Sequence, residues 1–113
     1  MDKVFNYKFS KIYSLLKAKA ERKGRSENEV ISCITWLTGY SPEDVRKESA
    51  GDLTMKEFFT SAPHMNDKRL LIKGTICGVK IAEIEDPLYK DIRILDKLID
   101  DLAKGKSLEK ILL

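Results

Sequence analysis

The amino-acid sequence predicts an all-α protein, a compact multihelical bundle of about six helices with residues 86–103 as its central helix. Three observations favour this fold class. Helix start and stop signals recur at short intervals along the chain. Apolar residues repeat at helical spacing in the longest segment. The 113 residues, 42% hydrophobic and 35% charged, are enough for one domain with its own core, so we expect residues 1–113 to form a single helical domain.

The first predicted helix runs from about Phe9 to Lys23. Gly24 follows it, and glycine readily adopts the left-handed conformation that ends a helix. Its apolar side chains fall at three- and four-residue spacing and therefore share one face of the helix. These residues are Phe9, Ile12, Tyr13, Leu16 and Ala20.

Three further helices are predicted, each begun by a residue whose side-chain oxygen can accept a hydrogen bond from the first helical turn. Ser26 and Thr54 are each followed three residues later by glutamate, which is the capping-box spacing. Ser41 precedes Pro42, and proline suits the first helical position because its missing N–H is not needed there. The helix that begins at Ser26 should end at Gly39, the one at Ser41 before Gly51, and the one at Thr54 before Pro63.

Residues 66–84 give conflicting signals. Asn66 or Asp67 could cap a helix, whereas two glycines weaken that helix and the β-branched residues around them favour a strand. A strand needs a partner for its backbone groups, and no second clear strand is visible. We therefore expect a helix to about Cys77 and an irregular link to Asp86. Residues 72–84, irregular or a short strand, are where an entirely helical prediction is most open to failure.

The longest predicted helix opens at Asp86-Pro87 and continues to about Ala103. Its apolar residues cover nearly half of the helix circumference, which is wider than the seam of a two-stranded coiled coil and favours the centre of a bundle. Ser107 then begins a last turn or two, whose apolar side chains should dock onto the core or onto a second subunit. The apolar residues of the long helix are Leu88, Ile92, Ile94, Leu95, Leu98, Ile99 and Leu102.

Three segments of the sequence together carry a resemblance to a protein family. They read WLTGY at 36–40, ICGV at 76–79 leading into IEDPL at 84–88, and LDKLID at 95–100 through AKGK to EKIL at 109–112. With them, the chain resembles the bacterial domain-of-unknown-function family number 2200 over nearly its whole length. The resemblance implies a compact multihelical fold in a cytoplasmic bacterial protein. It implies no activity and carries over no catalytic residues.

Cellular location and redox state follow from what the sequence lacks. The first residues have no long apolar core or cleavage site, and no apolar run approaches the roughly 20 residues of a membrane span. Cys33 and Cys77 lie in separate segments without metal-type spacing. We therefore expect a cytoplasmic protein with reduced thiols, no membrane association and no cofactor.

Residues with catalytic or metal-binding potential are few and scattered. His64 is the only histidine and lies in a predicted loop with no nucleophile pattern nearby. Cys33 is expected to be a buried structural thiol, whereas Cys77, beside a glycine, is more open to a ligand. The acidic residues 83–86 lack the regular alternation of a calcium loop, and Asp86 is better explained as a helix cap. We predict no catalytic, cofactor-binding or metal-ligating residue.

The basic first helix is the most specific functional signal. Residues 1–25 contain eight basic and two acidic side chains, a net charge of +6, so the other 88 residues sum to −3. Five basic residues fall within roughly 120° of arc, beside the apolar face. Such a stripe could contact phosphates, although it lacks the mixture of residues that reads base edges. The other interpretation is a solvated face whose lysine stems cover apolar surface. The candidate phosphate contacts are Lys8, Lys11, Lys19, Arg22 and Lys23.

Three functional interpretations follow. The leading one is a non-enzymatic helical binding or interaction module, as a homodimer or with a protein partner, because core signals are ample and no catalytic set is assembled. The alternative is weak electrostatic binding of nucleic acid through the basic first helix. The third is a small enzyme with a cleft near residues 64–86, which requires His64, Cys77 and a carboxylate to converge.

Overall fold

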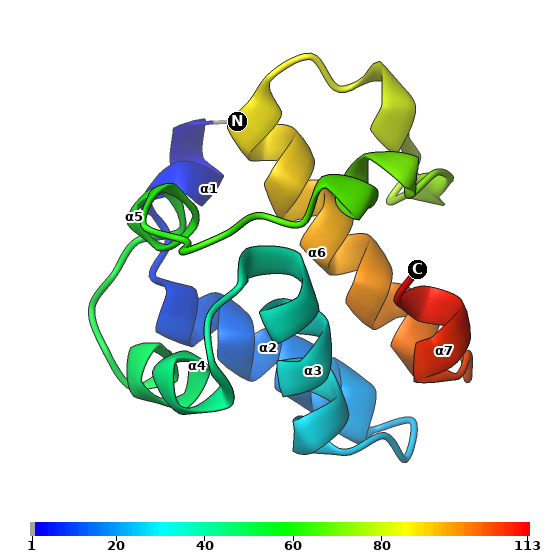
Figure 1. Cartoon of the computed structure of the whole chain (residues 1–113), viewed down its shortest axis with the longest axis horizontal. Helices are drawn as coiled ribbons and strands as arrows, with labels where there is room; N and C mark the ends of the chain where they lie inside the picture. Colours follow the sequence, from blue (N-terminus) through cyan, green and yellow to red (C-terminus); the bar gives the residue numbers. More distant parts are fainter. Residues whose placement is uncertain (1) are drawn as a thin grey trace.

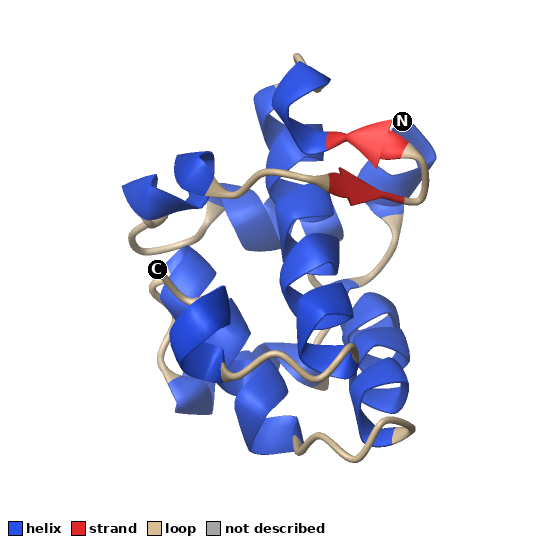
Figure 2. Ribbon diagram, turned by 90° about the vertical axis from the view of Figure 1, so that its right-hand side faces the viewer, coloured by secondary structure: helices blue, strands red, loops and turns tan. Residues whose placement is uncertain are grey.

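The structure, a computed structural model, describes residues 2–113 and is mostly helical, as predicted (Figure 1). Figure 2 shows two short strands lying together in a molecule otherwise made of helices and loops. In chain order the elements are α1 (Asp2–Asn6), α2 (Phe9–Glu21), α3 (Glu27–Thr38), α4 (Pro42–Ser49), α5 (Met55–Thr60), the 3₁₀-helix η1 (Asp67–Leu71), β1 (Thr75–Ile76), β2 (Val79–Lys80), the 3₁₀-helix η2 (Ile81–Glu83), α6 (Pro87–Ala103) and α7 (Leu108–Ile111).

Helix α6 is the central element, as the width of its apolar face indicates. It contacts α2, α3, α5, α7 and both the hairpin and the 3₁₀-helix that follows it. Each fully buried aliphatic side chain contributes about 1.5–3 kcal/mol of hydrophobic stabilisation, so this helix supplies a large share of the core. Its buried residues are Ile92, Ile94, Leu95, Leu98, Ile99 and Leu102.

The helix starts read from the sequence are confirmed by their hydrogen bonds. The Ser26 hydroxyl accepts from the Glu29 N–H at 3.2 Å, and the Glu29 carboxylate accepts from the Ser26 N–H at 3.0 Å. Thr54 and Glu57 make the same reciprocal pair at 3.1 and 2.9 Å. Asp86 caps α6, since its carboxylate accepts a backbone N–H of the first turn at 2.8 Å. These contacts satisfy donors that a helix start otherwise leaves unpaired.

A stack of aromatic rings joins the amino-terminal half of the chain. The rings of Phe9 and Phe58 lie 3.7 Å apart at their centroids and are almost parallel, and the Tyr40 ring stacks 4.5 Å from that of Phe58. The Tyr40 hydroxyl donates to the Phe58 carbonyl at 2.7 Å, so its polar tip is satisfied inside the core. Together these contacts fix α2, α5 and the α3–α4 junction in one unit.

The structure shows why the WLTGY segment has a glycine at position 39. It ends α3 with a φ of +80°, and a Cβ at this position would lie 2.8 Å from the backbone N and O of His64. The His64 N–H donates to the Thr38 carbonyl at 3.1 Å, which holds the loop after α5 over the end of α3. Only glycine allows both the left-handed backbone and this close approach.

The prediction of a helix from residue 66 to about Cys77 is wrong. The chain forms η1, and then β1 pairs antiparallel with β2. Between the strands Cys77 has φ +50° and Gly78 has φ +80°, the backbone of a two-residue hairpin turn with two left-handed positions. A non-glycine residue rarely adopts that conformation, so the residue type of Cys77 does not indicate a turn. Without the turn, the sequence shows no partner strand for β1. The short helix α1 was also not predicted.

Helix α7 docks onto the core of its own chain. Ile111 is buried, and Leu108 and Leu112 pack against the core from partly buried positions. Of the two placements expected for this segment, the structure therefore shows the one within the same chain. No helix in residues 2–113 combines the length and the apolar character needed to cross a bilayer.

Candidate functional site

A groove lies between the carboxyl ends of α2 and α6, which lie close together toward the lower right of Figure 1. Its volume of about 640 Å³ falls within the ~300–1,000 Å³ typical of sites for small ligands. Four of its lining side chains are basic and one is acidic, which gives the groove a formal charge of +3. The lining residues are Lys19, Arg22, Lys23, Asp100, Ala103 and Lys104.

The local sequence places these charges on one side. Lys19 lies in the last turn of α2, and Arg22 and Lys23 follow at three- and four-residue spacing, so all three project to the same face. Lys104 is the capping residue at the carboxyl end of α6, one helical turn after Asp100. The groove is basic because the carboxyl end of α2 contributes three cations, whereas the charges of Asp100 and Lys104 at the end of α6 cancel.

Part of this positive charge balances the two helix ends. The carboxyl end of a helix carries roughly −0.5 of an elementary charge, so the two ends together supply about −1. The side chains contribute +3. A clear positive excess therefore remains, and compensation of the helix dipoles does not account for all of the basic residues.

Asp100 is the one acidic side chain in the groove, and it binds two of the four cations. Its carboxylate lies 3.0 Å from the Lys19 ammonium and 2.9 Å from that of Lys104. Burial by itself raises the pKa of Asp100, but the hydrogen bonds from Lys104 and Lys19 outweigh burial and hold the pKa below its ordinary value. Among the described side chains, those of residues 3–113, Arg22 and Lys23 form no ion pair. These two cations are therefore available to an anion.

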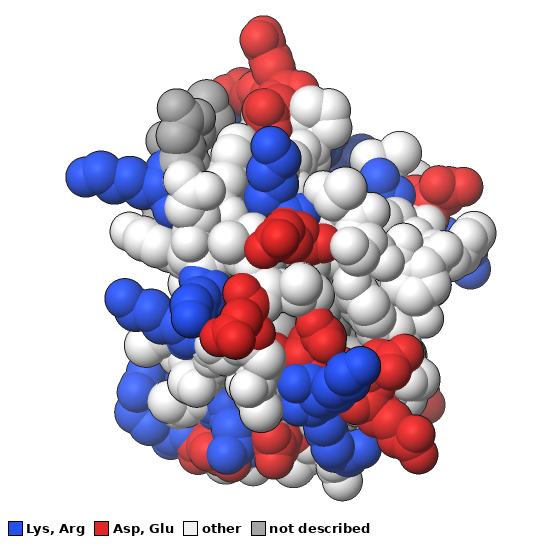
Figure 3. Space-filling model, turned by 90° about the vertical axis from the view of Figure 1, so that its left-hand side faces the viewer, with Lys and Arg blue, Asp and Glu red and all other residues white. Residues whose placement is uncertain are grey.

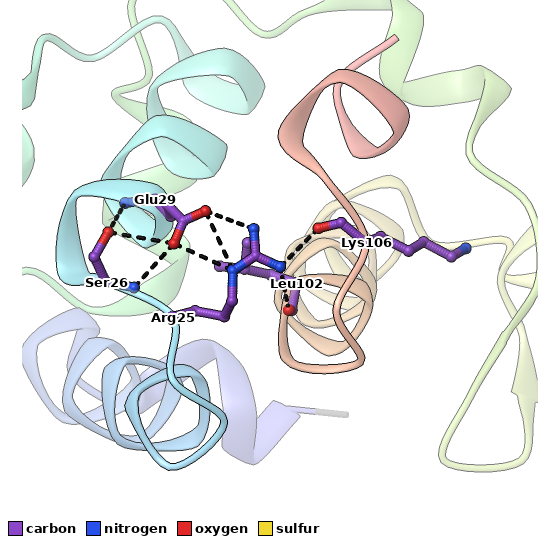
Figure 4. Close-up of polar contacts among 5 residues, drawn as sticks. All are labelled: Arg25, Ser26, Glu29, Leu102 and Lys106. Atoms are coloured by element: carbon purple, nitrogen blue, oxygen red, sulfur yellow. Dashed lines mark hydrogen bonds and ion pairs between the residues drawn. The ribbon is translucent and has the colours of Figure 1, made fainter.

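Arg25 fixes the position of α3 relative to the end of α6 (Figure 4). Its guanidinium donates to the carbonyl oxygens of Leu102 and Lys106 at 2.9 and 2.7 Å, and to the Glu29 carboxylate at 3.2 Å. The hydrogen bond from Arg25, with a second from the Ser26 backbone, lowers the pKa of Glu29 to about 2. Sequence reasoning did not single out Arg25, because the carbonyls that it binds lie far along the chain.

The structure separates the five predicted phosphate contacts into two groups. Lys19, Arg22 and Lys23 line the groove. Lys8 and Lys11 lie at the opposite end of α2, outside it. The groove also contains Asp100 and Lys104, which the sequence analysis missed. Their four-residue spacing on α6 is visible in the sequence, but their position opposite α2 is not.

The amino end of α2 offers no comparable concentration of positive charge. Lys8 pairs with Asp52 at 3.0 Å, and the Lys11 ammonium lies 5.5 Å from the centre of the Tyr7 ring. Figure 3 shows the side of the molecule around α1, α4 and α5, where basic and acidic side chains are interspersed. At its amino end, the predicted stripe is therefore partly balanced by an acidic and an aromatic neighbour.

The residues considered for catalysis are held by different elements. His64 follows α5, Cys77 lies exposed in the hairpin turn, and neither lines the groove. Cys33 is fully buried, and burial raises the pKa of its thiol to about 12, so it stays protonated at neutral pH. No group of three or more histidine, cysteine or acidic residues in the described part of the chain is arranged to hold a metal ion.

A second, smaller groove of about 150 Å³ lies beside α7. Its lining includes Leu71, which is 61% exposed, and Leu113, which is also exposed. Leu70 adds another exposed apolar side chain on η1.

The predictions of a homodimer or a protein partner, and of a cytoplasmic location, stay predictions.

The described residues form a small, mostly helical protein with a basic groove between α2 and α6. The chain belongs to the family described as "Uncharacterized protein conserved in bacteria (DUF2200)", whose model matches residues 3–113. It is also similar to the solved structure titled "Crystal structure of uncharacterized protein SP1917", with 46% identity, a TM-score of 0.94, and coverage of 99% of this chain and 92% of that one. No match was found among curated proteins. These findings confirm the family resemblance.

Proposed function

We propose that the protein is a non-enzymatic binding module whose ligand carries a phosphate group, held in the groove between α2 and α6. The observation that carries this proposal is the gathering of four basic side chains in one groove with a single, already paired carboxylate. Lys19, Arg22 and Lys23 keep the role of phosphate contacts, and Lys104 joins them. Lys8 and Lys11, at the other end of α2, are not part of the site.

Simple electrostatics sets the strength of binding. Two unit charges about 4 Å apart attract by ~1 kcal/mol in water and ~4 kcal/mol near a protein surface. Several such contacts, reduced by salt and by the cost of ordering lysine and arginine side chains, correspond to a dissociation constant of about 10 µM to 1 mM. The affinity should fall as salt is added, because the groove is open to solvent.

A phosphate group is shared by small phosphorylated molecules and by nucleic-acid backbones. The observations favour a small ligand. Three of the five candidate contacts lie at one end of α2 and line the groove, whereas Lys8 at the other end is paired with Asp52. A nucleic acid bound through the whole helix would require Lys8 and Lys11 to take part.

The test compares two double variants of the same helix. Arg22→Gln/Lys23→Gln removes two charges from the groove, and Lys8→Gln/Lys11→Gln removes two charges from the other end. Binding of inorganic pyrophosphate is measured by calorimetry at two salt concentrations, and binding of a fluorescent single-stranded DNA is measured by anisotropy. We expect the groove variant to weaken pyrophosphate binding about tenfold and the control variant to change it less than about twofold.

Three outcomes would contradict the proposal. One is the absence of saturable pyrophosphate binding by the wild type. Another is an equal loss of pyrophosphate binding in both double variants, which would mean a non-specific charge effect. The third is tight DNA binding that both variants weaken equally, which would favour contact along the whole of α2 and hence the nucleic-acid interpretation.

A further inference from the structure

The carboxylate of Asp100 occupies a position in the groove that an anionic ligand would compete for. It bridges two ammonium groups from different helices, that of Lys19 on α2 at 3.0 Å and that of Lys104 on α6 at 2.9 Å. The Asp100 side chain is largely buried, whereas that of Lys104 is mostly exposed. The groove therefore already holds one anionic group, supplied by its own wall.

The four cations divide into two pairs. Lys19 and Lys104 are joined through Asp100. Arg22 and Lys23 line the same groove and form no ion pair with the described side chains, those of residues 3–113. A ligand with a single phosphate group is satisfied by the unpaired cations alone. A ligand with two phosphate groups can also engage the other pair, but only in competition with the carboxylate.

We propose that Asp100 marks a second anion subsite, and that its carboxylate stands where the second phosphate group of a diphosphate-bearing ligand binds. The carboxylate thereby sets the selectivity of the groove, because it disfavours ligands of higher negative charge. The inference rests on the proposed function. A ligand phosphate takes over hydrogen bonds from Lys19 and Lys104, and the carboxylate opposes it by competition and by like-charge repulsion. Both effects increase with the charge of the ligand.

A neighbouring residue provides a matched control. Asp101 lies on the same helix, is equally buried, and also binds two lysines, Lys97 at 2.9 Å and Lys106 at 3.5 Å. It does not line the groove between α2 and α6. Asp100→Asn and Asp101→Asn therefore change the net charge equally and remove similar ion pairs, but only the first alters the proposed subsite.

The experiment measures the binding of inorganic phosphate and of pyrophosphate to the wild type, Asp100→Asn and Asp101→Asn at low salt. Asp100→Ser serves as a second neutral variant of different size, and thermal unfolding verifies that each variant is folded. We expect Asp100→Asn to tighten pyrophosphate binding about tenfold and phosphate binding about threefold. Asp101→Asn should change either value less than about twofold.

The outcomes separate the inference from the proposed function. If pyrophosphate binds the wild type and is lost in Arg22→Gln/Lys23→Gln, but Asp100→Asn binds both anions as the wild type does, the second subsite is refuted and the groove remains. Weaker binding by Asp100→Asn also refutes it, since Asp100 would then position the lysines for the ligand. Equal gains for both anions refute the selectivity. If the wild type shows no saturable binding of pyrophosphate, the proposed function itself fails.

Discussion

The two ends of helix α2 carry similar basic residues but form very different surfaces. At the amino end, Lys8 pairs with Asp52 across side chains that are 58% and 92% exposed. At the carboxyl end, Lys19, Arg22 and Lys23 face a second helix across a groove. The charges are alike, and the difference is made by the neighbouring element. Only at the carboxyl end does another part of the chain, the end of α6, form a groove with the basic residues of α2.

The rigidity of the two ends differs for the same reason. Arg25 ties the turn after α2 to α3 and to the carboxyl end of α6 through charged hydrogen bonds. Lys8 makes a single exposed ion pair, and such pairs contribute about 0–1 kcal/mol. We therefore expect substitutions at the carboxyl end to affect stability much more than those at the amino end. The following predictions test this difference, from the largest effect to the smallest.

Replacement of Arg25 tests the largest expected difference in stability between the two ends of α2. Arg25→Ala removes hydrogen bonds to the carbonyls of Leu102 and Lys106 and leaves the Glu29 carboxylate without its main partner. We expect a loss of about 2–4 kcal/mol in the free energy of unfolding, measured with urea. The control, Lys8→Ala, should cost less than about 0.5 kcal/mol. Similar losses in the two variants would mean that the ends do not differ in stability.

The dependence of stability on acid pH tests the hydrogen bonds between Arg25 and Glu29. The pKa of Glu29 is lowered from 4.5 to about 2, chiefly by the hydrogen bond from Arg25. A carboxyl group whose pKa is lower in the folded state stabilises the protein above its unfolded pKa and loses this effect as pH falls through the folded pKa. Stability should therefore decline between about pH 4.5 and pH 2. Because the Glu29 side chain is 29% exposed and partly screened, its share should be about 1–2 kcal/mol.

The variant Glu29→Gln isolates that contribution. Urea unfolding of the wild type and the variant at several pH values should show the wild type more stable at neutral pH, with the difference shrinking toward pH 2. Asp52→Asn, which removes the exposed carboxylate at the amino end, should leave the pH profile nearly unchanged. A constant difference between wild type and Glu29→Gln across the acid range would refute the role assigned to the Arg25–Glu29 pair.

The smallest expected effect concerns the amino end alone. Asp52→Asn frees Lys8 from its partner and should change the free energy of unfolding by less than about 0.5 kcal/mol. It should also change pyrophosphate affinity less than about twofold, because Lys8 lies outside the groove. Tighter binding by this variant, measured by calorimetry, would reveal a latent anion site at the amino end and remove the contrast between the two ends.

Much of the helical architecture could be predicted because it depends on neighbours in the sequence. The capping boxes at Ser26 and Thr54, and the cap at Asp86, involve residues three positions apart. The wide apolar face of α6 likewise predicted its central place. The hairpin could not be predicted in this way, since its turn requires Cys77 in a left-handed conformation that its residue type does not indicate.

The sequence by itself determined that the segments of α2 to α6 are helical, where most of these helices begin and end, and that α2 is basic. These are properties of local hydrogen bonding and of periodicity. The tertiary structure decided which basic residues line the groove between α2 and α6. Asp52 neutralises Lys8 from 44 residues away, and Asp100 reaches Lys19 from 81 residues away. Charges so far apart in the chain act on each other only after packing brings them within a few ångströms, because electrostatic attraction depends on distance in space.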